Sequence, residues 1–374
     1  MRIERRLSQP RWLYAAVPVG SLAFAFLAIA AVLAATHHDP FHTYRRLVES
    51  AFTGSGALSG TFTFATPLLF TGLAAAAAFR MNLFNIGAEG QFYLGATGGI
   101  GAALWLGGGS TPALIAISIA AGAAAGAAWA LIPGVLRAFA RTNEIITSLM
   151  LNYVAARLLE YLIYGSHSFW RDTTSPSAQV FPLGKVLPNA AGWPSYGSGV
   201  VIPFGFILAV AVAALLWGLY SRTRFGFELQ VIGDSPRAAQ YAGMRTRQKI
   251  LAVMALSGAI AGLGGAAQEG NFDHRLDPRG LQQAYYGYTG IVVAALARYN
   301  PFAVVLVAFL IGGLQNAGYT LQGADFPSGL VGVMQGIILF CALGGELLVR
   351  YRITVPRWSR GSQPPVPSAA EARQ

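Results

Sequence analysis

Charged side chains are scarce in this sequence. Asp, Glu, Lys and Arg make up 11% of the 374 residues, about half the fraction usual in soluble domains. Hydrophobic residues make up 54%, and the mean hydropathy is +0.50. Apolar stretches of about 18 residues or more recur along the whole length, without the alternation that barrel strands require. The sequence therefore predicts an all-α, polytopic membrane protein.

Residue types that bind metals or act as nucleophiles are also few. The one cysteine, Cys341, excludes a disulfide framework and a cysteine metal site. No P-loop pattern occurs, so an ATP site of that kind is absent. All five histidines fall in predicted outer loops, which leaves none inside a span for a hydrolase or metal site: His37, His38, His42, His167 and His274. We therefore expect no enzymatic activity, metal site or cofactor in this chain.

Polarity inside the predicted spans is mostly uncharged. No deep carboxylate stands out, as a proton-coupled carrier would need. Arg157 and Glu160 are three residues apart on one helix and are expected to pair near its outer end. The other polar residues in the spans suit a neutral polar solute: Asn152, Tyr153, Gln315, Asn316 and Gln335.

Ten spans are predicted, within a helical core over 13–349 of a single domain over 1–374. The run from Leu13 to Ala35 is too long for a signal peptide, so it is taken as a retained helix. Ten spans put both termini on one side. That side holds 19 Lys and Arg residues and the other side 6, which predicts cytoplasmic termini and leaves no support for nucleic-acid binding. The spans are 13–35, 61–79, 84–106, 112–136, 143–164, 200–220, 250–268, 283–297, 302–320 and 329–349.

Two connections are longer than ordinary turns. Residues 165–199, on the periplasmic side, are predicted as an ordered surface loop with short helices at best. Residues 221–249, on the cytoplasmic side, predict a helix over 236–242, with Asp234 or Ser235 as its cap and Gly243 as its end. Such a short helix is unstable alone, so it is either an amphipathic connector or a docking element. The tail over 358–374 is predicted to be disordered.

Two polar breaks interrupt the apolar pattern. In "MNLFNIGAEGQF", residues 81–92, Asn85 can cap the next helix and Glu89 falls in its first turn. Capping and glycine packing would explain this stretch, but broken helices also carry polar sites in transporters. A second break, "YYGYTG" at 285–290, starts a helix from the opposite side. The pair indicates an inverted repeat.

Six segments then carry a resemblance to a known family. They are "FNIGAEGQF" (84–92), "TNEIITSLMLNYVA" (142–155), "FGFELQVIGDSPRAAQYAGM" (225–244), "LSGAIAGLGGA" (256–266), "GYTGIVVAALA" (287–297) and "GVMQGIILFCALGGELL" (332–348). In this order they resemble the inner-membrane permease of bacterial nucleoside and simple-sugar ABC importers, in particular the longer permease of guanosine-type systems. The resemblance covers residues 60–348 and implies a type II ABC importer permease core.

The resemblance also implies partners and site residues. The partners are a second, shorter permease in a heterodimer, an ATPase with two fused nucleotide-binding domains, a periplasmic substrate-binding lipoprotein and the lipid of the bacterial inner membrane; ATP is bound and hydrolysed by the ATPase. Pathway or gate candidates are Asn85, Glu89, Gln91, Asn143, Glu144 and Asn152. ATPase coupling is implied for Asp234, Ser235, Pro236, Arg237, Ala238, Ala239, Tyr241 and Gly243. The chain departs from the family pattern at Asp234, where an asparagine is usual, and at Gln268 followed by Glu269.

We therefore expect the permease subunit of an ATP-driven importer. Nucleosides are the first candidate cargo and simple sugars the second. A secondary transporter or channel acting alone is the rival, and a lone carrier would not need the capped segment at 225–244. A scaffold without a pore is disfavoured by the uncharged polar groups in the spans.

Overall fold

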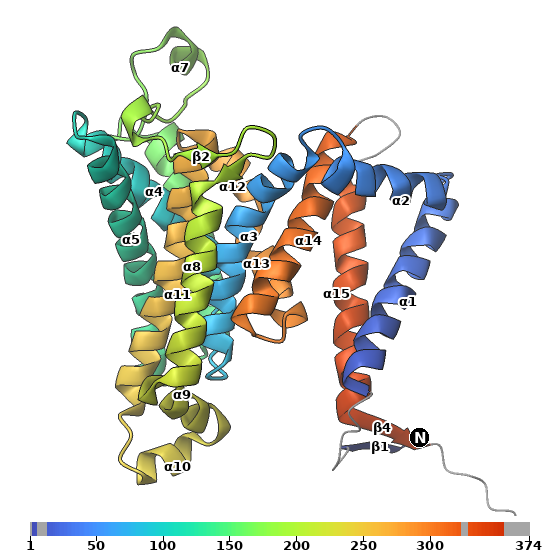
Figure 1. The fold of residues 1–374 in the computed structure, drawn as a ribbon. Coiled ribbons are helices and arrows are strands. Elements are labelled where there is room, and N and C mark those ends of the chain that lie inside the picture. Colours follow the sequence, from blue (N-terminus) through green and yellow to red (C-terminus); the bar gives the residue numbers. More distant parts are fainter. Residues whose placement is uncertain (1, 6–12, 323–327, 355–374) are drawn as a thin grey trace, which may run out of the picture. The chain divides into compact units, whose positions relative to one another are not determined.

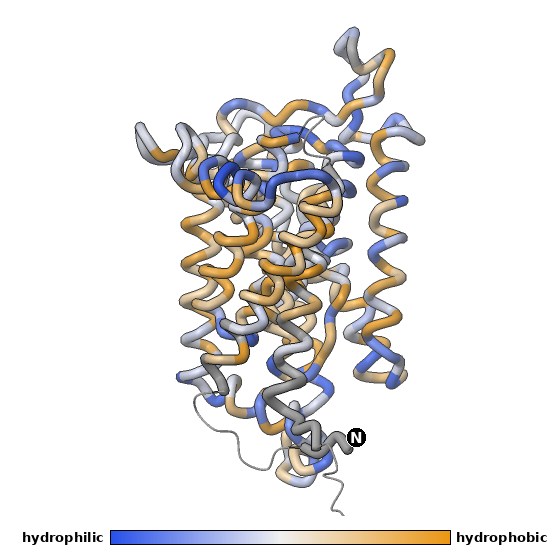
Figure 2. The backbone as a smooth tube through the Cα atoms, turned by 90° about the vertical axis from the view of Figure 1, so that its right-hand side faces the viewer, coloured by the Kyte–Doolittle hydropathy of each residue, from blue (hydrophilic) through white to orange (hydrophobic). Residues whose placement is uncertain are grey.

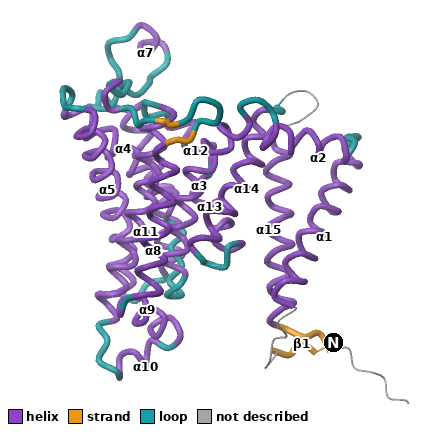
Figure 3. Tube along the Cα trace, viewed as in Figure 1, coloured by secondary structure: helices purple, strands orange, loops and turns teal. Residues whose placement is uncertain are grey.

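The computed structural model describes residues 2–5, 13–322 and 328–354, and these residues are nearly all helical (Figure 3). Their contacts form two compact units, Met1–Ile29 with Ile337–Gln374, and Ala30–Gly336. The single domain over 1–374 therefore stays a prediction. The tail predicted as disordered, 358–374, lies outside the described residues.

The smaller unit holds most of α1 (Leu13–Ala35) and the second half of α15 (Ser328–Arg350). A strand pair accompanies them, because β1 (Arg2–Arg5) pairs antiparallel with β4 (Tyr351–Thr354), with Arg2 opposite Thr354. A side chain at Gly345 would collide with Ser21, so this glycine lets the two helices approach closely. The strands were not expected from the sequence.

The larger unit is a bundle of long helices with short elements at both ends (Figure 1). Its long helices are α3 (Ala57–Phe79), α4 (Ala88–Leu106), α5 (Thr111–Ala140), α6 (Glu144–Glu160), α8 (Phe204–Arg222), α11 (Thr246–Gln268) and α14 (Pro301–Thr320). At one end lie α2 (Pro40–Val48), α7 (Pro176–Val180), β2 (Ser195–Tyr196), β3 (Ile202–Pro203) and α12 (Pro278–Ala284), and at the other α9 (Arg224–Asp234) and α10 (Pro236–Tyr241). α13 (Tyr286–Leu296) lies between α12 and α14 in the chain. Hydrophobic residues predominate along the long helices, and hydrophilic ones gather in the connections (Figure 2).

Glycines bring three helices of this unit into backbone contact. A methyl group at Gly126 of α5 would collide with the carbonyl oxygen of Gly258 of α11. One at Gly95 of α4 would collide with the backbone of Gly262 of α11. Close approach through small residues is the usual way in which membrane helices associate without a hydrophobic driving force. α3 lies at the centre and is buried around its circumference, including Phe70.

All ten predicted spans coincide with helices, but the expected number of membrane crossings is confirmed only in part. Among the described residues, six helices are long and apolar enough to cross a membrane, or seven if the bent pair Ala23–Ala35 and Pro40–Thr53 is one span. The uninterrupted span predicted at 283–297 is wrong. α13 has 11 residues, about 16 Å of helix against roughly 30 Å of hydrocarbon. Tyr285, with φ of 50°, separates it from α12.

The loop over 165–199 is ordered by contacts with the bundle. It contains α7, the 3-10 turn Asn189–Ala191 and β2, which pairs with β3. The indole Nε1 of Trp170 donates to the carbonyl oxygen of Thr97 at 2.9 Å. The backbone N–H of Trp193 donates to the carbonyl oxygen of Gly270 at 2.8 Å. The predicted surface loop with short helices is confirmed in this respect.

Candidate functional site

Asn85 lies in the non-helical segment between α3 and α4, and it holds that segment in shape. The residue that caps α4 is Gly87, so the prediction that Asn85 caps this helix is wrong. Its amide and that of Gln91 instead exchange two hydrogen bonds, of 2.9 and 3.0 Å. The Nδ2 of Asn85 also donates to the hydroxyl of Ser257 on α11 at 2.9 Å. The first polar break is therefore tied to both α4 and α11.

Glu89 connects the two polar breaks. It lies in the first turn of α4, as predicted, and is buried. Its Oε2 accepts the backbone N–H groups of Gly287 at 2.5 Å and Tyr288 at 3.2 Å, and its Oε1 accepts the hydroxyl of Tyr93 at 2.6 Å. The carboxylate thus satisfies free N–H groups at the start of α13, where the helix dipole favours negative charge. A Cβ at Gly287 would collide with Glu89, so only glycine fits there.

Asn152 of α6 holds the same two breaks from a third helix. Its Oδ1 accepts the backbone N–H of Gly90 at 2.9 Å. Its Nδ2 donates to the carbonyl oxygen of Ile86 at 2.8 Å and to the hydroxyl of Tyr288 at 3.2 Å. Since a buried amide needs partners on both atoms, this arrangement fixes α6 against both breaks. We call the hydrogen-bonded group Asn85, Glu89, Gln91, Tyr93, Asn152, Gly287 and Tyr288 the joint.

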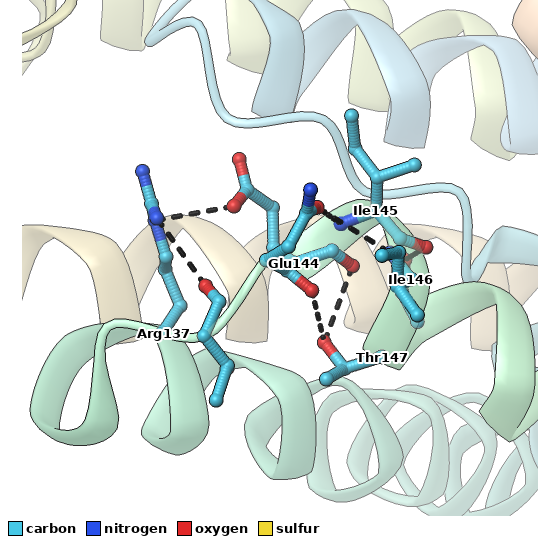
Figure 4. Close-up of polar contacts among 8 residues, drawn as sticks. Arg137, Glu144, Ile145, Ile146 and Thr147 are labelled. Carbon is cyan, nitrogen blue, oxygen red and sulfur yellow. Dashed lines mark hydrogen bonds and ion pairs between the residues drawn. The ribbon is translucent and has the colours of Figure 1, made fainter.

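The two remaining gate candidates form a separate group where α5 meets α6 (Figure 4). Asn143 caps α6, accepting from the amides of Ile145 at 2.9 Å and Ile146 at 3.5 Å. The buried Glu144 pairs with Arg137 of α5, with Nε and Oε2 3.1 Å apart. Of the three candidates in the segment 142–155, Asn152 therefore belongs to the joint, whereas Asn143 and Glu144 lie at the start of α6.

Several residues of the joint, and Ser257, which is bonded to it, were not foreseen as site residues. Ser257 lies in a segment that otherwise indicates only glycine packing. Gly287 and Tyr288 lie in the second break, but their contact with Glu89 spans 198 and 199 positions. A single sequence carries no signal for a pairing at that separation.

The segment at 221–249 that was predicted for coupling contains two helices rather than one. Thr223 caps α9, which was not predicted, and Asp234 is its last residue. Ser235 is therefore the cap of α10, its hydroxyl accepting the amide of Ala238 at 3.3 Å. Gly243, with φ of 77°, follows the helix in the left-handed conformation, as expected of a residue that ends it. Ala239 is buried, whereas Tyr241 is 94% exposed.

The same segment is fastened to the bundle near the first polar break. The Nδ2 of Asn82 donates to the carbonyl oxygen of Gly233 in α9 at 2.9 Å. Glu228 of α9 forms an ion pair with Lys249 of α11. A cleft of about 680 Å³ lies beside these contacts, lined by residues 81–83, the end of α5, the α9–α10 segment and the start of α11. α9 is thus bonded to the segment that precedes Asn85.

Glu269 follows Gln268 at the second departure from the family pattern, and its position is buried, which is unfavourable for a carboxylate. It is 1% exposed, and neither carboxylate oxygen has a hydrogen-bond partner among the described residues. A buried carboxylate without a partner destabilises a fold. We therefore expect Glu269→Gln to keep or raise the midpoint of thermal unfolding of the purified protein in detergent. The control is Glu49→Gln at an exposed pair with Arg45, and a fall of several degrees at position 269 alone would contradict this reading.

A multi-pass helical chain whose buried polar groups join two interrupted helices has the construction of a transmembrane permease. The family described as branched-chain amino acid transport system / permease component matches residues 57–343, and the chain belongs to this family. It is a multi-pass membrane protein and the permease subunit of an ABC importer, not an enzyme, and such permeases work with an ATPase and a binding protein.

Three relatives with named cargo transport glucose, guanosine or nucleosides. The chain is 32% identical to the glucose ABC transporter permease protein TsgB13 of Haloferax volcanii, an archaeon, over 98% of this chain and 96% of that one. It is 32% identical to the guanosine ABC transporter permease protein NupP of Bacillus subtilis, over 86% and 91%. It is 27% identical to the nucleoside ABC transporter permease protein NupB of Lactococcus lactis subsp. cremoris, over 87% and 89%. A second permease from each organism also resembles this chain. The identity is 26% for that of Haloferax volcanii, 25% for that of Bacillus subtilis and 26% for that of Lactococcus lactis subsp. cremoris.

Proposed function

We propose that this permease forms one side of the translocation pathway for nucleosides, which a periplasmic binding lipoprotein delivers. The observation that carries the proposal is the joint, where an uncharged network and one fully engaged carboxylate connect two broken helices. Guanosine and nucleoside permeases among the relatives support this cargo. Glucose is the second candidate, since a glucose permease is equally similar.

We propose that the joint is the gate. The chain enters α4 from the segment bonded to α9, and it enters α13 from α12, which lies at the other end of the bundle (Figure 1); this suits an inverted repeat in a type II importer core. Glu89 holds these two starts together. Separation of α13 from α4 breaks the two hydrogen bonds that the Glu89 carboxylate accepts from Gly287 and Tyr288, so the closed state is held firmly until ATP-driven movement supplies the work.

We propose that α9 and α10 receive that movement from the ATPase. Arg237, Ala238 and Tyr241 are exposed on α10 and are available to a partner, whereas Ala239 packs inward. The bond between Asn82 and Gly233 supports transmission toward the joint. Asp234, Ser235, Pro236 and Gly243 set the shape of the segment.

A second permease and a defined orientation complete the proposal. The paired permeases in the three related organisms support a heterodimer with a shorter permease. The 19-to-6 distribution of Lys and Arg supports a position in the bacterial inner membrane with both termini, and residues 221–249, in the cytoplasm. Residues 165–199 would then face the periplasm.

Cysteine labelling tests this orientation. In a Cys341→Ser background, we expect a membrane-impermeant thiol reagent to label Val180→Cys in intact cells, since this position is 71% exposed in the 165–199 loop. Arg237→Cys should be labelled only after the membrane is opened. Labelling of position 237 but not position 180 in intact cells would invert the proposed orientation.

Cargo is tested with the complete importer, purified with its second permease, ATPase and binding lipoprotein. We expect guanosine to stimulate ATP hydrolysis and glucose to leave it at the basal rate. Stimulation of ATP hydrolysis by glucose and not by guanosine would assign the second candidate cargo. Guanosine uptake by the permease without the binding protein and the ATPase would contradict the importer mechanism.

A further inference from the structure

Three tyrosines surround the exposed side of the joint. Tyr153 follows Asn152 on α6 and is 60% exposed. Tyr285 lies at the break between α12 and α13 and is 59% exposed. Tyr288 is partly buried and accepts a hydrogen bond from Asn152, and its ring centroid lies 6.3 Å from that of Tyr285. These rings come from two helices that the joint holds together.

Its depth sets Tyr153 apart from ordinary membrane tyrosines. Tyr153 stands nine residues after Glu144 in the 22-residue span Glu144–Gly165, near its middle. Tyrosines in spans usually lie at the interfaces, where water satisfies the hydroxyl. No hydrogen bond joins the hydroxyl of Tyr153 or Tyr285 to any residue that the structure describes. An exposed hydroxyl at this depth is unfavourable against lipid, which indicates that this face meets a polar path.

The charge of the surroundings limits what such a surface can select. The carboxylate of Glu89 is engaged by three donors, from Tyr93, Gly287 and Tyr288, and is buried behind the tyrosines. The amide of Asn152 is likewise satisfied on both atoms. The tyrosines therefore offer flat aromatic faces and hydroxyl groups but no free charge. Aromatic rings stack on nucleobases with little dependence on the base, and hydroxyls can bond a ribose.

We propose that Tyr153, Tyr285 and Tyr288 form the surface of this permease that contacts the solute, and that it takes a neutral solute with an aromatic ring and hydroxyl groups, a nucleoside. This inference rests on the proposed function and deepens it. The three tyrosines are specificity-determining residues, and Tyr288 also belongs to the joint, which is the gate. A sugar presents no aromatic ring, so it gains less from this surface.

The test uses the complete importer in proteoliposomes, with guanosine and glucose as probes. We expect Tyr153→Leu and Tyr285→Leu each to lower kcat/KM for guanosine uptake about tenfold, since stacking on the ring is lost, and Tyr153→Phe to stay within about twofold. The matched control is Tyr161→Leu, on the π-helical turn that continues α6, with an equal exposed fraction of 60%. It should also stay within about twofold. Co-purification of the second permease and basal ATP hydrolysis should be unchanged in all four variants.

Three results distinguish a failure of this inference from a failure of the proposed function. If the wild-type importer takes up guanosine and both leucine variants keep its uptake within about twofold, the inference is wrong while the proposed function stands. If the leucine variants lose the second permease on purification, the tyrosines belong to a subunit interface and the inference is also wrong. If the wild-type importer takes up glucose but no guanosine, the proposed cargo and the inference are both wrong.

Discussion

Glu89→Ala is expected to lower ATP-driven guanosine uptake by about tenfold to a hundredfold, and to lower the amount of folded protein much less. The change leaves two backbone N–H groups at the start of α13 and the hydroxyl of Tyr93 without their acceptor. Each hydrogen bond to a charged group contributes about 1.5–3 kcal/mol, and tenfold corresponds to about 1.4 kcal/mol. The glycine contacts among α4, α5 and α11 remain, so the bundle should still form.

The measurement is initial uptake in proteoliposomes, normalised to reconstituted permease. Glu89→Gln is the informative second variant, because its side-chain oxygen can still accept the N–H groups of Gly287 and Tyr288. It should retain more uptake than alanine. The matched control is Glu49→Ala at an exposed ion pair with Arg45. A folded Glu89→Ala variant with normal uptake would make Glu89 a dispensable cap.

Ala238→Trp is expected to abolish the stimulation of ATP hydrolysis by guanosine while the permease still inserts and folds. Ala238 is an exposed residue of α10, a six-residue helix that is too short to be stable alone and needs a surface to dock against. A bulky side chain in a tight contact costs about 1–3 kcal/mol, which is enough to weaken association tenfold or more. Ala238→Glu should act in the same direction.

Co-purification of the ATPase and stimulated hydrolysis measure this effect. Ala113→Trp serves as the control, since Ala113 is an exposed alanine at the opposite end of the larger unit. Ala239 is buried, so a tryptophan there would disturb α10 itself and is not informative. Normal assembly and stimulation in both Ala238 variants would mean that the segment is a passive connector.

Local signals in the sequence locate most of the helices. Apolar runs place all ten helices that were predicted as spans, and the Ser-Pro and Gly signals give the start and end of α10. Arg157 and Glu160 pair as expected, with Nη1 and Oε2 2.5 Å apart. These features depend on residues within a few positions of one another, so one sequence contains what determines them.

Features that depend on distant residues were missed or wrong. Asn85 has the residue type of a cap, but its partner Ser257 is 172 positions away, and tertiary contacts outweighed the local preference. Glu89 lies in a first turn as expected, but two of its three partners, Gly287 and Tyr288, lie on α13. The break at 285–290 was expected to start a helix, and α13 starts at Tyr286; only the joining of the residues before it into one span at 283–297 was wrong. α9 was missed because its pattern is that of a polar connection.

If the joint is the gate, α13 must part from α4 and α6 during transport. Gln282 of α12 donates to Glu160 of α6 at 3.1 Å, and α12 leads directly into α13, outside the joint. In a Cys341→Ser background, Gln282→Cys and Glu160→Cys can be bridged with a short, reductant-cleavable thiol reagent. We expect bridged importers to lose guanosine uptake, reductant to restore it, and each single-cysteine variant to be unaffected by the reagent. Guanosine uptake at the full rate by bridged importers would contradict it.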